Sequence, residues 1–84
     1  MTDPFALKKK LDLLKVRPTD QELLELYGYY KQATIGDCNI PEPSMFNYTS
    51  NSKWHAWNKQ RGLSRDLSIK RWKQAALEIL SKYS

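Results

Sequence analysis

The sequence has very little of the chemistry that builds disulfides, metal centres or membrane spans. Among its 84 residues are one cysteine, Cys38, and one histidine, His55. A single cysteine excludes an internal disulfide, and no C-x-x-C pair is present to hold a metal. No long uninterrupted apolar run occurs, so the pattern predicts neither a signal peptide nor a transmembrane helix. We therefore expect a cytoplasmic protein without stable membrane insertion.

Signatures of catalysis are missing as well. The sequence contains no phosphate-binding glycine loop, no dinucleotide-binding glycine motif and no H-E-x-x-H motif. The residues three and four positions from His55 are weak metal ligands, so a surface or packing role is expected for it. Cys38 and His55 are the alternative as nucleophile and base, but no third group supports them, and Cys38 is expected to be a small hydrophobic residue in a loop. We predict no enzyme activity, no cofactor and no metal.

The composition is that of one folded domain with a basic surface. Hydrophobic residues make up 40% and charged residues 27% of the chain, which excludes a disordered class. A chain of this length builds one modest core, so we expect a single domain over residues 1–84. The net charge of +5 favours an anionic partner over a cationic one. No additional apolar face is evident, so a monomer is expected.

The N-terminal part of the chain predicts two helices. Asp3 and Pro4 are typical of a helix start, Pro18 is expected to stop this first helix, and its lysines are expected to form a solvated face. Thr19 to Glu22 then matches a capping box, which starts a second helix that runs to about Ile35. The apolar residues at helical spacing are Leu7, Leu11 and Leu14 in the first helix and Leu23, Leu26, Tyr27, Tyr30 and Ala33 in the second.

The C-terminal part predicts two more helices after a long connection. Residues 36–52 contain two prolines and three asparagines and are expected to form a loop, of a length that is often functional. Ser50 or Asn51 is expected to cap a third helix that ends with Gly62 in the C′ position. Ser64 is expected to cap a fourth helix. Its apolar stripe is Ile69, Trp72, Ala76, Ile79, Leu80 and Tyr83. The sequence thus predicts an all-α bundle of four helices.

The second helix carries an unusual group of side chains. Tyr27, Tyr30, Lys31 and Thr34 follow helical spacing and share one face. Core packing of the tyrosines, with Lys31 extended along them, is one interpretation. A second aromatic and cation pair, Lys53 beside Trp54, favours another: rings that stack on a flat ring and ammonium groups that meet phosphate. A nucleotide-bearing ligand fits these residues.

These residues also carry a resemblance to a known family. The run "LYGYYKQATIGDCN", Leu26 to Asn39, and the later "KWHAWN", Lys53 to Asn58, resemble the signature of the acyl-CoA-binding protein family. That signature is a Tyr-x-x-Tyr-Lys-Gln-Ala-x-x-Gly-Asp-x-Asn run followed by Lys-Trp-x-Ala-Trp. Further matching positions are Pro43, Met45, Gly62 and Ser64. The resemblance extends in order over essentially the whole chain.

The resemblance implies a fold, a ligand and a set of site residues. The family fold is an up-down-down-up four-helix bundle with a long loop between its second and third helices. Its members bind medium- to long-chain fatty acyl-CoA esters non-covalently, as intracellular carriers that maintain a pool of the ester. By position, the 3′-phosphate of the CoA headgroup is expected at Tyr27, Lys31 and Lys53, with Tyr30 on its adenine side. Leu23 and Leu24 are expected to line the groove for the acyl chain.

Several positions differ from the family pattern. Trp72 stands where a tyrosine usually contacts the headgroup, so we include Trp72 among the headgroup residues. Asp12 and Thr49 occupy positions where members often carry a phosphate-facing lysine. Fewer cations predict a weaker or less salt-sensitive interaction with the headgroup.

Leu7 and Lys8 stand where the family has small residues, which suggests a narrowed groove and a shorter or differently placed acyl chain. Each buried methylene is worth about 0.8 kcal/mol. Two extra methylenes are therefore expected to tighten binding about tenfold until the groove is full.

Three other roles compete with acyl-CoA binding. The run "KWHAWNKQRGLSRDLSIKRWK" is basic and aromatic, and two helices across Gly62 would suit a nucleic-acid-binding module. Its charges are spread around both helices, however, and we expect no nucleic-acid partner. The missing lysines would also suit a protein-interaction domain that has lost its ligand. A membrane-surface role is less favoured, because no helix combines a strongly basic side with an exposed apolar one, although transient contact during loading or delivery is compatible with the sequence.

Overall fold

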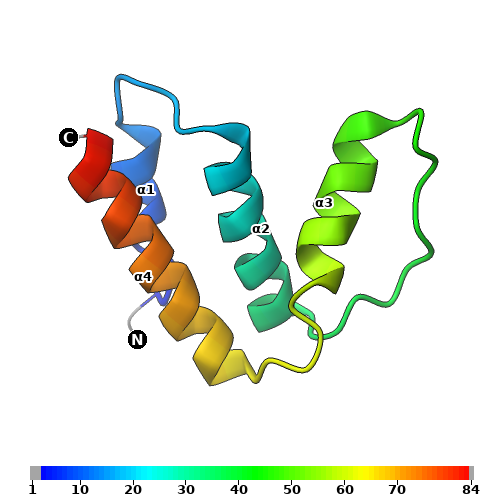
Figure 1. Ribbon diagram of the computed structural model, residues 1–84. Coiled ribbons are helices and arrows are strands. Elements are labelled where there is room, and N and C mark those ends of the chain that lie inside the picture. The colour runs from blue at the N-terminus through cyan, green and yellow to red at the C-terminus, as the bar shows by residue number, and fades with distance from the viewer. Residues whose placement is uncertain (1–2, 84) are drawn as a thin grey trace.

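The computed structural model describes residues 3–83, so positions 1–2 and 84 of the predicted domain lie outside the described residues. It contains α1 (Lys8–Asp12), α2 (Asp20–Thr34), α3 (Tyr48–Asn58) and α4 (Arg65–Tyr83). Figure 1 shows that α2 and α3 run in the same direction, while α1 and α4 run in the opposite one. Residues 3–83 form no strand. The prediction of an all-α, up-down-down-up bundle is confirmed.

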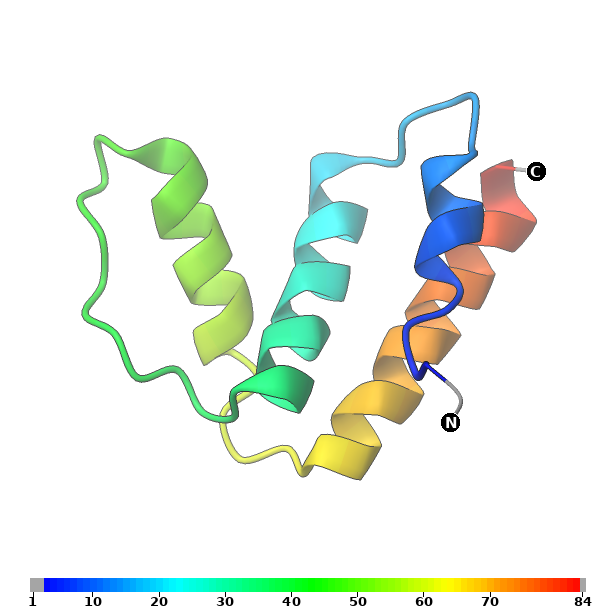
Figure 2. The same cartoon turned by 180° about the vertical axis from the view of Figure 1, so that it is seen from behind.

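The helices form a flat molecule with α2 at its centre. Helix α2 packs against both α3 and α4, and α1 packs against α4. The overall extents are 36 × 30 × 17 Å. Seen from behind, α1 crosses in front of α4 (Figure 2). One face of α2 is therefore directed toward α1 and α4, and another toward α3. None of the four described helices is long and apolar enough to cross a membrane.

The core lies between α2 and α4. Trp72, Ala76 and Ile79, from the predicted stripe of α4, are all buried, and Ala76 is completely inaccessible. Burying a large apolar side chain is worth about 1.5–3 kcal/mol, so this seam fixes α4 on α2. The buried cluster is Leu26, Trp72, Ala75, Ala76 and Ile79, and the residues packed against it are Phe5, Leu7, Leu11, Leu14, Tyr29 and Tyr83.

Two predicted helix starts are confirmed by their hydrogen bonds. The Thr19 hydroxyl accepts from the backbone N–H of Glu22 at 3.1 Å, and the Glu22 carboxylate accepts from the backbone N–H of Thr19 at 2.8 Å. Ser64 Oγ accepts from the backbone N–H of Leu67 at 3.1 Å at the start of α4. Both caps join residues three positions apart, so the local sequence suffices to specify them.

The limits of the first and third helices differ from the prediction. Helix α1 spans only Lys8–Asp12 and ends well before Pro18, because it has no side-chain cap and no buried residue. Helix α3 begins at Tyr48, so neither Ser50 nor Asn51 is its cap, and the loop is shorter than predicted. Asn51 instead donates to the Glu42 carboxylate at 3.0 Å and to the Pro43 carbonyl at 2.9 Å.

Gly62 is also displaced from its predicted position. Helix α3 ends at Asn58, so Gly62 lies beyond C′. Tight i to i+3 hydrogen bonds, including Arg61 N–H to the Asn58 carbonyl at 3.1 Å, extend the chain to that point. Gly62 then adopts a φ of 91°, a left-handed conformation that favours glycine.

Candidate functional site

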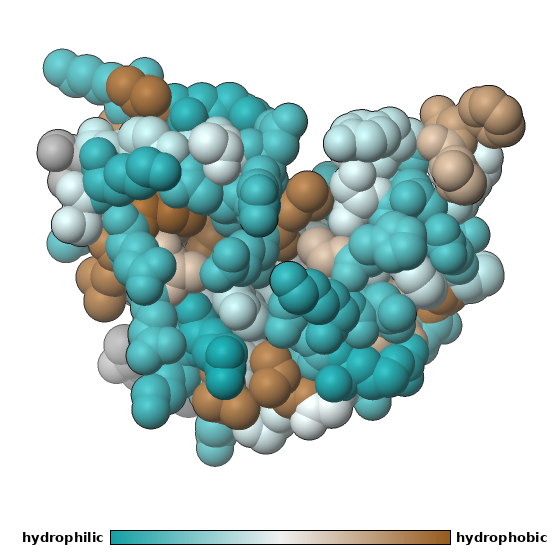
Figure 3. Space-filling model, viewed as in Figure 1, coloured by the Kyte–Doolittle hydropathy of each residue, from teal (hydrophilic) through white to brown (hydrophobic). Residues whose placement is uncertain are grey.

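Two cavities share part of α2 as a common wall. The first, of about 390 Å³, lies between α1, α2 and α4. The second, of about 330 Å³, lies between α2 and the first turns of α3. Leu23 and Tyr27 line both cavities. In the space-filling view, the molecule is hollowed between its α2 side and its α3 side (Figure 3). An elongated ligand that passes Tyr27 would therefore occupy both.

The first cavity is mainly apolar and aromatic, with one ion pair. Its lining residues are Lys8, Leu11, Asp12, Pro18, Leu23, Leu26, Tyr27, Tyr30 and Trp72. Lys8 and Asp12 form the ion pair, with a distance of 3.3 Å between Nζ and Oδ2. Three aromatic side chains line one enclosed space, which suits a flat ring. Asp12, which departs from the family pattern, gives this cavity a carboxylate.

The second cavity is apolar along α2 and polar along α3. Its lining residues are Arg17, Asp20, Leu23, Leu24, Tyr27, Tyr48, Thr49, Ser52 and Lys53. Arg17 and Asp20 form an ion pair at 2.8 Å. Leu23 and Leu24 provide an apolar wall, as a hydrocarbon chain requires. Thr49, the other position that lacks a family lysine, lies here.

The two predicted lysines occupy different surroundings. Lys53 Nζ lies 5.5 Å from the ring centroid of Tyr27, so α3 contributes a cation where the two cavities meet. Lys31 Nζ lies 4.6 Å from the ring centroid of buried Trp57 and lines neither cavity. Both geometries are cation–π contacts within the usual range. Lys31 would need to leave Trp57 to reach a ligand at Tyr27.

Tyr30 and Trp72 are held together by a residue that the sequence did not single out. The Phe5 ring packs edge-on against Tyr30 at 4.8 Å and against Trp72 at 5.0 Å between centroids. Trp72 is only 3% exposed, yet it also lines the first cavity. Trp72 is thus a core residue with one edge in that cavity. Phe5 precedes α1, so no helical spacing pointed to it.

Trp54 does not join Lys53 in an aromatic and cation group facing α2. Its indole N–H donates to the Ile40 carbonyl at 2.8 Å, which directs the ring toward the loop. Tyr48 lines the second cavity instead. The sequence missed Tyr48 because the helix start was predicted too late. A helix beginning at Asn47 would have placed Tyr48 and Ser52 on one face by their spacing of four.

Charged residues of the long loop tie it to the ends of the helices. Asp37 Oδ1 accepts from the Gly62 N–H at 2.8 Å and from the Gln32 amide at 2.8 Å, and these bonds lower the pKa of Asp37. Glu42 accepts from Asn51 and lies 3.1 Å from His55 Nε2, contacts that lower the pKa of Glu42. The loop therefore fixes α3 beside α2.

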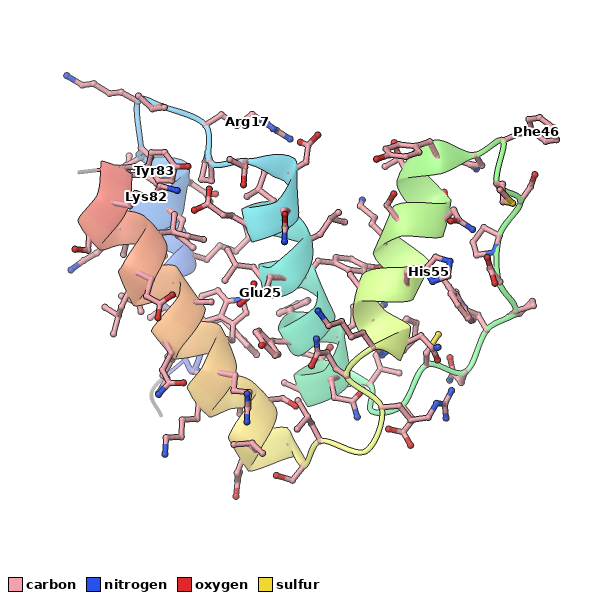
Figure 4. All side chains as sticks on the ribbon, viewed as in Figure 1. Arg17, Glu25, Phe46, His55, Lys82 and Tyr83 are labelled. Atoms are coloured by element: carbon pink, nitrogen blue, oxygen red, sulfur yellow. The ribbon has the colours of Figure 1, made fainter. Side chains whose placement is uncertain are left out.

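Neither Cys38 nor His55 contributes to the cavities. Cys38 is buried in the loop, as predicted, with its thiol 3.9 Å from the Ile40 carbonyl. His55 contacts the loop carboxylate of Glu42, which its helical neighbours did not reveal; Figure 4 shows His55 on the loop side of α3. Within residues 3–83, no group of histidine, cysteine and carboxylate side chains is arranged to hold a metal ion.

The comparisons with known proteins agree on one family. The family described as "Acyl CoA binding protein" matches residues 5–76. The chain belongs to the acyl-CoA-binding protein family. A relative from a species of the genus Hypsibius, named "Putative acyl-CoA-binding protein", is 44% identical over 69 residues, which cover 82% of this chain and 78% of that protein.

Solved structures of acyl-CoA-binding proteins share the fold. Oryza sativa Acyl-CoA-Binding Protein 2 superposes with a TM-score of 0.87 at 28% identity, covering 94% of this chain and 86% of that one. The protein from Moniliophthora perniciosa superposes with a TM-score of 0.83 at 36% identity, covering 94% and 77%. Within this family, the positions that depart from its pattern at Asp12, Thr49 and Trp72 all line one of the two cavities.

Proposed function

We propose that this protein binds medium- to long-chain fatty acyl-CoA esters non-covalently and acts as a monomeric carrier and pool former in the cytoplasm, with residues 1–84 as one acyl-CoA-binding domain and no catalytic activity. The observation that supports this most directly is the pair of cavities joined at Leu23 and Tyr27. A ligand with a flat ring at one end and a hydrocarbon chain at the other matches their linings.

The predicted site residues divide between the cavities according to the part of the ligand assigned to them. Tyr30 and Trp72, assigned to the headgroup, line only the first cavity. Leu24, assigned to the acyl chain, lines the second cavity but not the first. We propose that the adenine ring stacks in the first cavity and the acyl chain lies in the second. The 3′-phosphate would then lie at Tyr27, within reach of Lys53.

Lys31 has a second, conditional part in this proposal. Its ammonium lies over Trp57 when no ligand is bound. A cation–π contact is worth about 0.5–1 kcal/mol at an exposed site, whereas a hydrogen bond to a charged group is worth about 1.5–3 kcal/mol. A phosphate at Tyr27 would therefore draw Lys31 away from the indole. Trp57 fluorescence would report this movement.

A calorimetric titration tests the proposal. The protein is titrated with hexadecanoyl-CoA below its micelle concentration, and separately with the analogue that lacks the 3′-phosphate. We expect one-to-one binding that is clearly weaker without the phosphate, because Lys53 then loses a charged partner. The absence of saturable heat with hexadecanoyl-CoA and with shorter acyl-CoA esters would refute the proposed function.

A further inference from the structure

Two groups of apolar side chains project from loops rather than packing into the core. Leu13 and Val16, in the connection between α1 and α2, are 80% and 57% exposed. Met45 and Phe46, at the end of the loop before α3, are 80% and 101% exposed. Figure 4 shows the Phe46 ring directed away from α3 into solvent. Side chains this large have no folding role at such exposure, and grouped apolar exposure marks an interaction site.

Both groups lie at the same end of the molecule. Figures 1 and 2 show the α1–α2 connection and the start of α3 together at the upper end in both views. Apolar surface is visible there on each side of the central hollow (Figure 3). Tyr48 links this end to the ligand space, because it is 77% exposed and also lines the second cavity. The proposed acyl cavity thus opens between the two apolar tips.

We propose that these two tips form a docking surface for an anionic lipid bilayer. The α3-side tip lies in residues 43–52, which contain no charged side chain, so its insertion among lipid headgroups would desolvate no charge. On the other tip, Lys15 stands between Leu13 and Val16, is exposed, and has no ion-pair partner among the described residues. A basic residue beside apolar side chains complements anionic lipid.

The shape of this surface favours a bilayer over a protein partner. The tips come from separate loops with a hollow between them, so a rigid partner would need two matched pockets at a fixed spacing. A fluid interface accommodates both tips, and side chains at such an interface enter about 5–10 Å. Docking here would direct the mouth of the second cavity at the lipid. This inference uses surface residues alone and does not depend on acyl-CoA binding.

Vesicle flotation of the ligand-free protein tests the proposal. Binding is measured to phosphatidylcholine vesicles with and without phosphatidylserine. We expect binding that requires phosphatidylserine and is about tenfold weaker for Phe46→Ser, which removes one apolar side chain from the interface. Lys15→Glu is expected to weaken it at least about fivefold, because one basic residue near the surface is worth about 1 kcal/mol.

Matched control variants change equivalent residues at the other end of the molecule. Ile35→Ser removes an apolar side chain that is 52% exposed beyond the end of α2, and Lys70→Glu reverses a charge in α4. Both are expected to bind vesicles as the wild type does. Hexadecanoyl-CoA titration of Phe46→Ser is expected to match the wild type, since Phe46 lines neither cavity.

Three results would overturn the proposal. The first is no vesicle binding by the wild-type protein. The second is equal weakening by the control and tip variants, which would indicate a general charge or stability effect. The third is concentration-dependent dimerisation that Phe46→Ser abolishes while vesicle binding is unchanged, because the tips would then bind a second copy of the chain. Loss of acyl-CoA binding with intact vesicle binding would refute only the proposed function.

Discussion

The ammonium group of Lys53 on α3 lies 5.5 Å from the ring centroid of Tyr27 on α2. This pair spans the junction at which the first and second cavities meet. Its geometry depends on how closely the two helices approach, and Gly28 sets that approach: a side chain there would meet the Ala56 carbonyl of α3. The charge at the site and the packing of the helices are therefore coupled through neighbouring residues of α2.

Replacing Lys53 tests its assignment to the 3′-phosphate. Lys53→Met keeps the length and apolar stem of the side chain but removes the charge. We expect the affinity for hexadecanoyl-CoA to fall tenfold or more, because a hydrogen bond to a charged group is worth about 1.5–3 kcal/mol. Calorimetric titration should also show that the preference for the ligand with the 3′-phosphate shrinks.

Lys59→Met is the matched control for this experiment. Lys59 is exposed at the end of α3 and lines neither of the two cavities. Its removal lowers the net charge equally and is expected to leave the affinity within about twofold. If Lys53→Met weakened the two ligands by the same factor, Lys53 would not contact the 3′-phosphate.

Gly28→Ala is expected to separate α2 from α3. The added Cβ would meet the backbone carbonyl of Ala56, which cannot move independently of its helix. Overpacking typically costs about 1–3 kcal/mol, and the better helix propensity of alanine returns up to about 1 kcal/mol. We expect a net loss of about 1–2 kcal/mol in the free energy of unfolding, measured by urea titration, together with weaker acyl-CoA binding.

Glu25→Ala serves as the control for that substitution. It places alanine on an exposed position of the same helix, and it is expected to be neutral or slightly stabilising. Equal stability of Gly28→Ala and the wild type would show that α3 can shift without loss of packing.

The helix interiors were predictable from the sequence because their signals are local. The capping box of Thr19 and Glu22 and the Ser64 cap each join residues three positions apart. The start of α3 was not predictable in this way. Asn47 makes no side-chain capping bond, and Asn51 is occupied by Glu42, which is nine residues away. Contacts across a loop leave no periodic pattern in the sequence.

The site was predictable as a set of residues but not as an arrangement. Tyr27, Tyr30 and Lys31 follow helical spacing, yet successive positions on a helix point about 100° apart. Tyr30 therefore turns toward Phe5, while Lys31 turns toward Trp57 on α3. Only the packing of α2 between its neighbours decides which cavity each side chain reaches. The family resemblance supplied their identities, and tertiary structure supplied the division between two cavities.

Acid is expected to weaken the attachment of α2 to the end of α4. A hydrogen bond from the Tyr83 hydroxyl, assisted by the Thr19 N–H and by Lys82, lowers the pKa of Glu22 to about 2 from an ordinary 4.5. Because the folded pKa lies below the unfolded one, this carboxylate contributes stability that is present above about pH 4.5 and is lost as the pH falls toward 2.

The Tyr83→Phe variant isolates this contribution. Urea midpoints are measured for the variant and the wild type at several pH values. We expect the variant to be less stable at neutral pH, with a difference that narrows from about pH 4.5 and vanishes near pH 2. Glu25→Gln is the control for general effects of acid, because Glu25 has no ion pair among the described residues. A difference that stayed constant with pH would mean that Tyr83 acts through packing alone.

Asp12 provides the last test, because it puts a negative charge where the headgroup is proposed to bind. Its carboxylate lines the first cavity and pairs with Lys8 at 3.3 Å. Asp12→Asn removes a charge that repels the CoA phosphates and frees Lys8 to face them. We expect hexadecanoyl-CoA to bind several-fold more tightly, with a larger gain at low salt, because charges around 10 Å apart are screened at about 0.1 M ionic strength. Glu78→Gln, exposed on α4, makes the same change in net charge and is expected to have little effect. An equal gain in both variants would show that net charge, rather than the first cavity, controls the affinity, and would place the headgroup elsewhere.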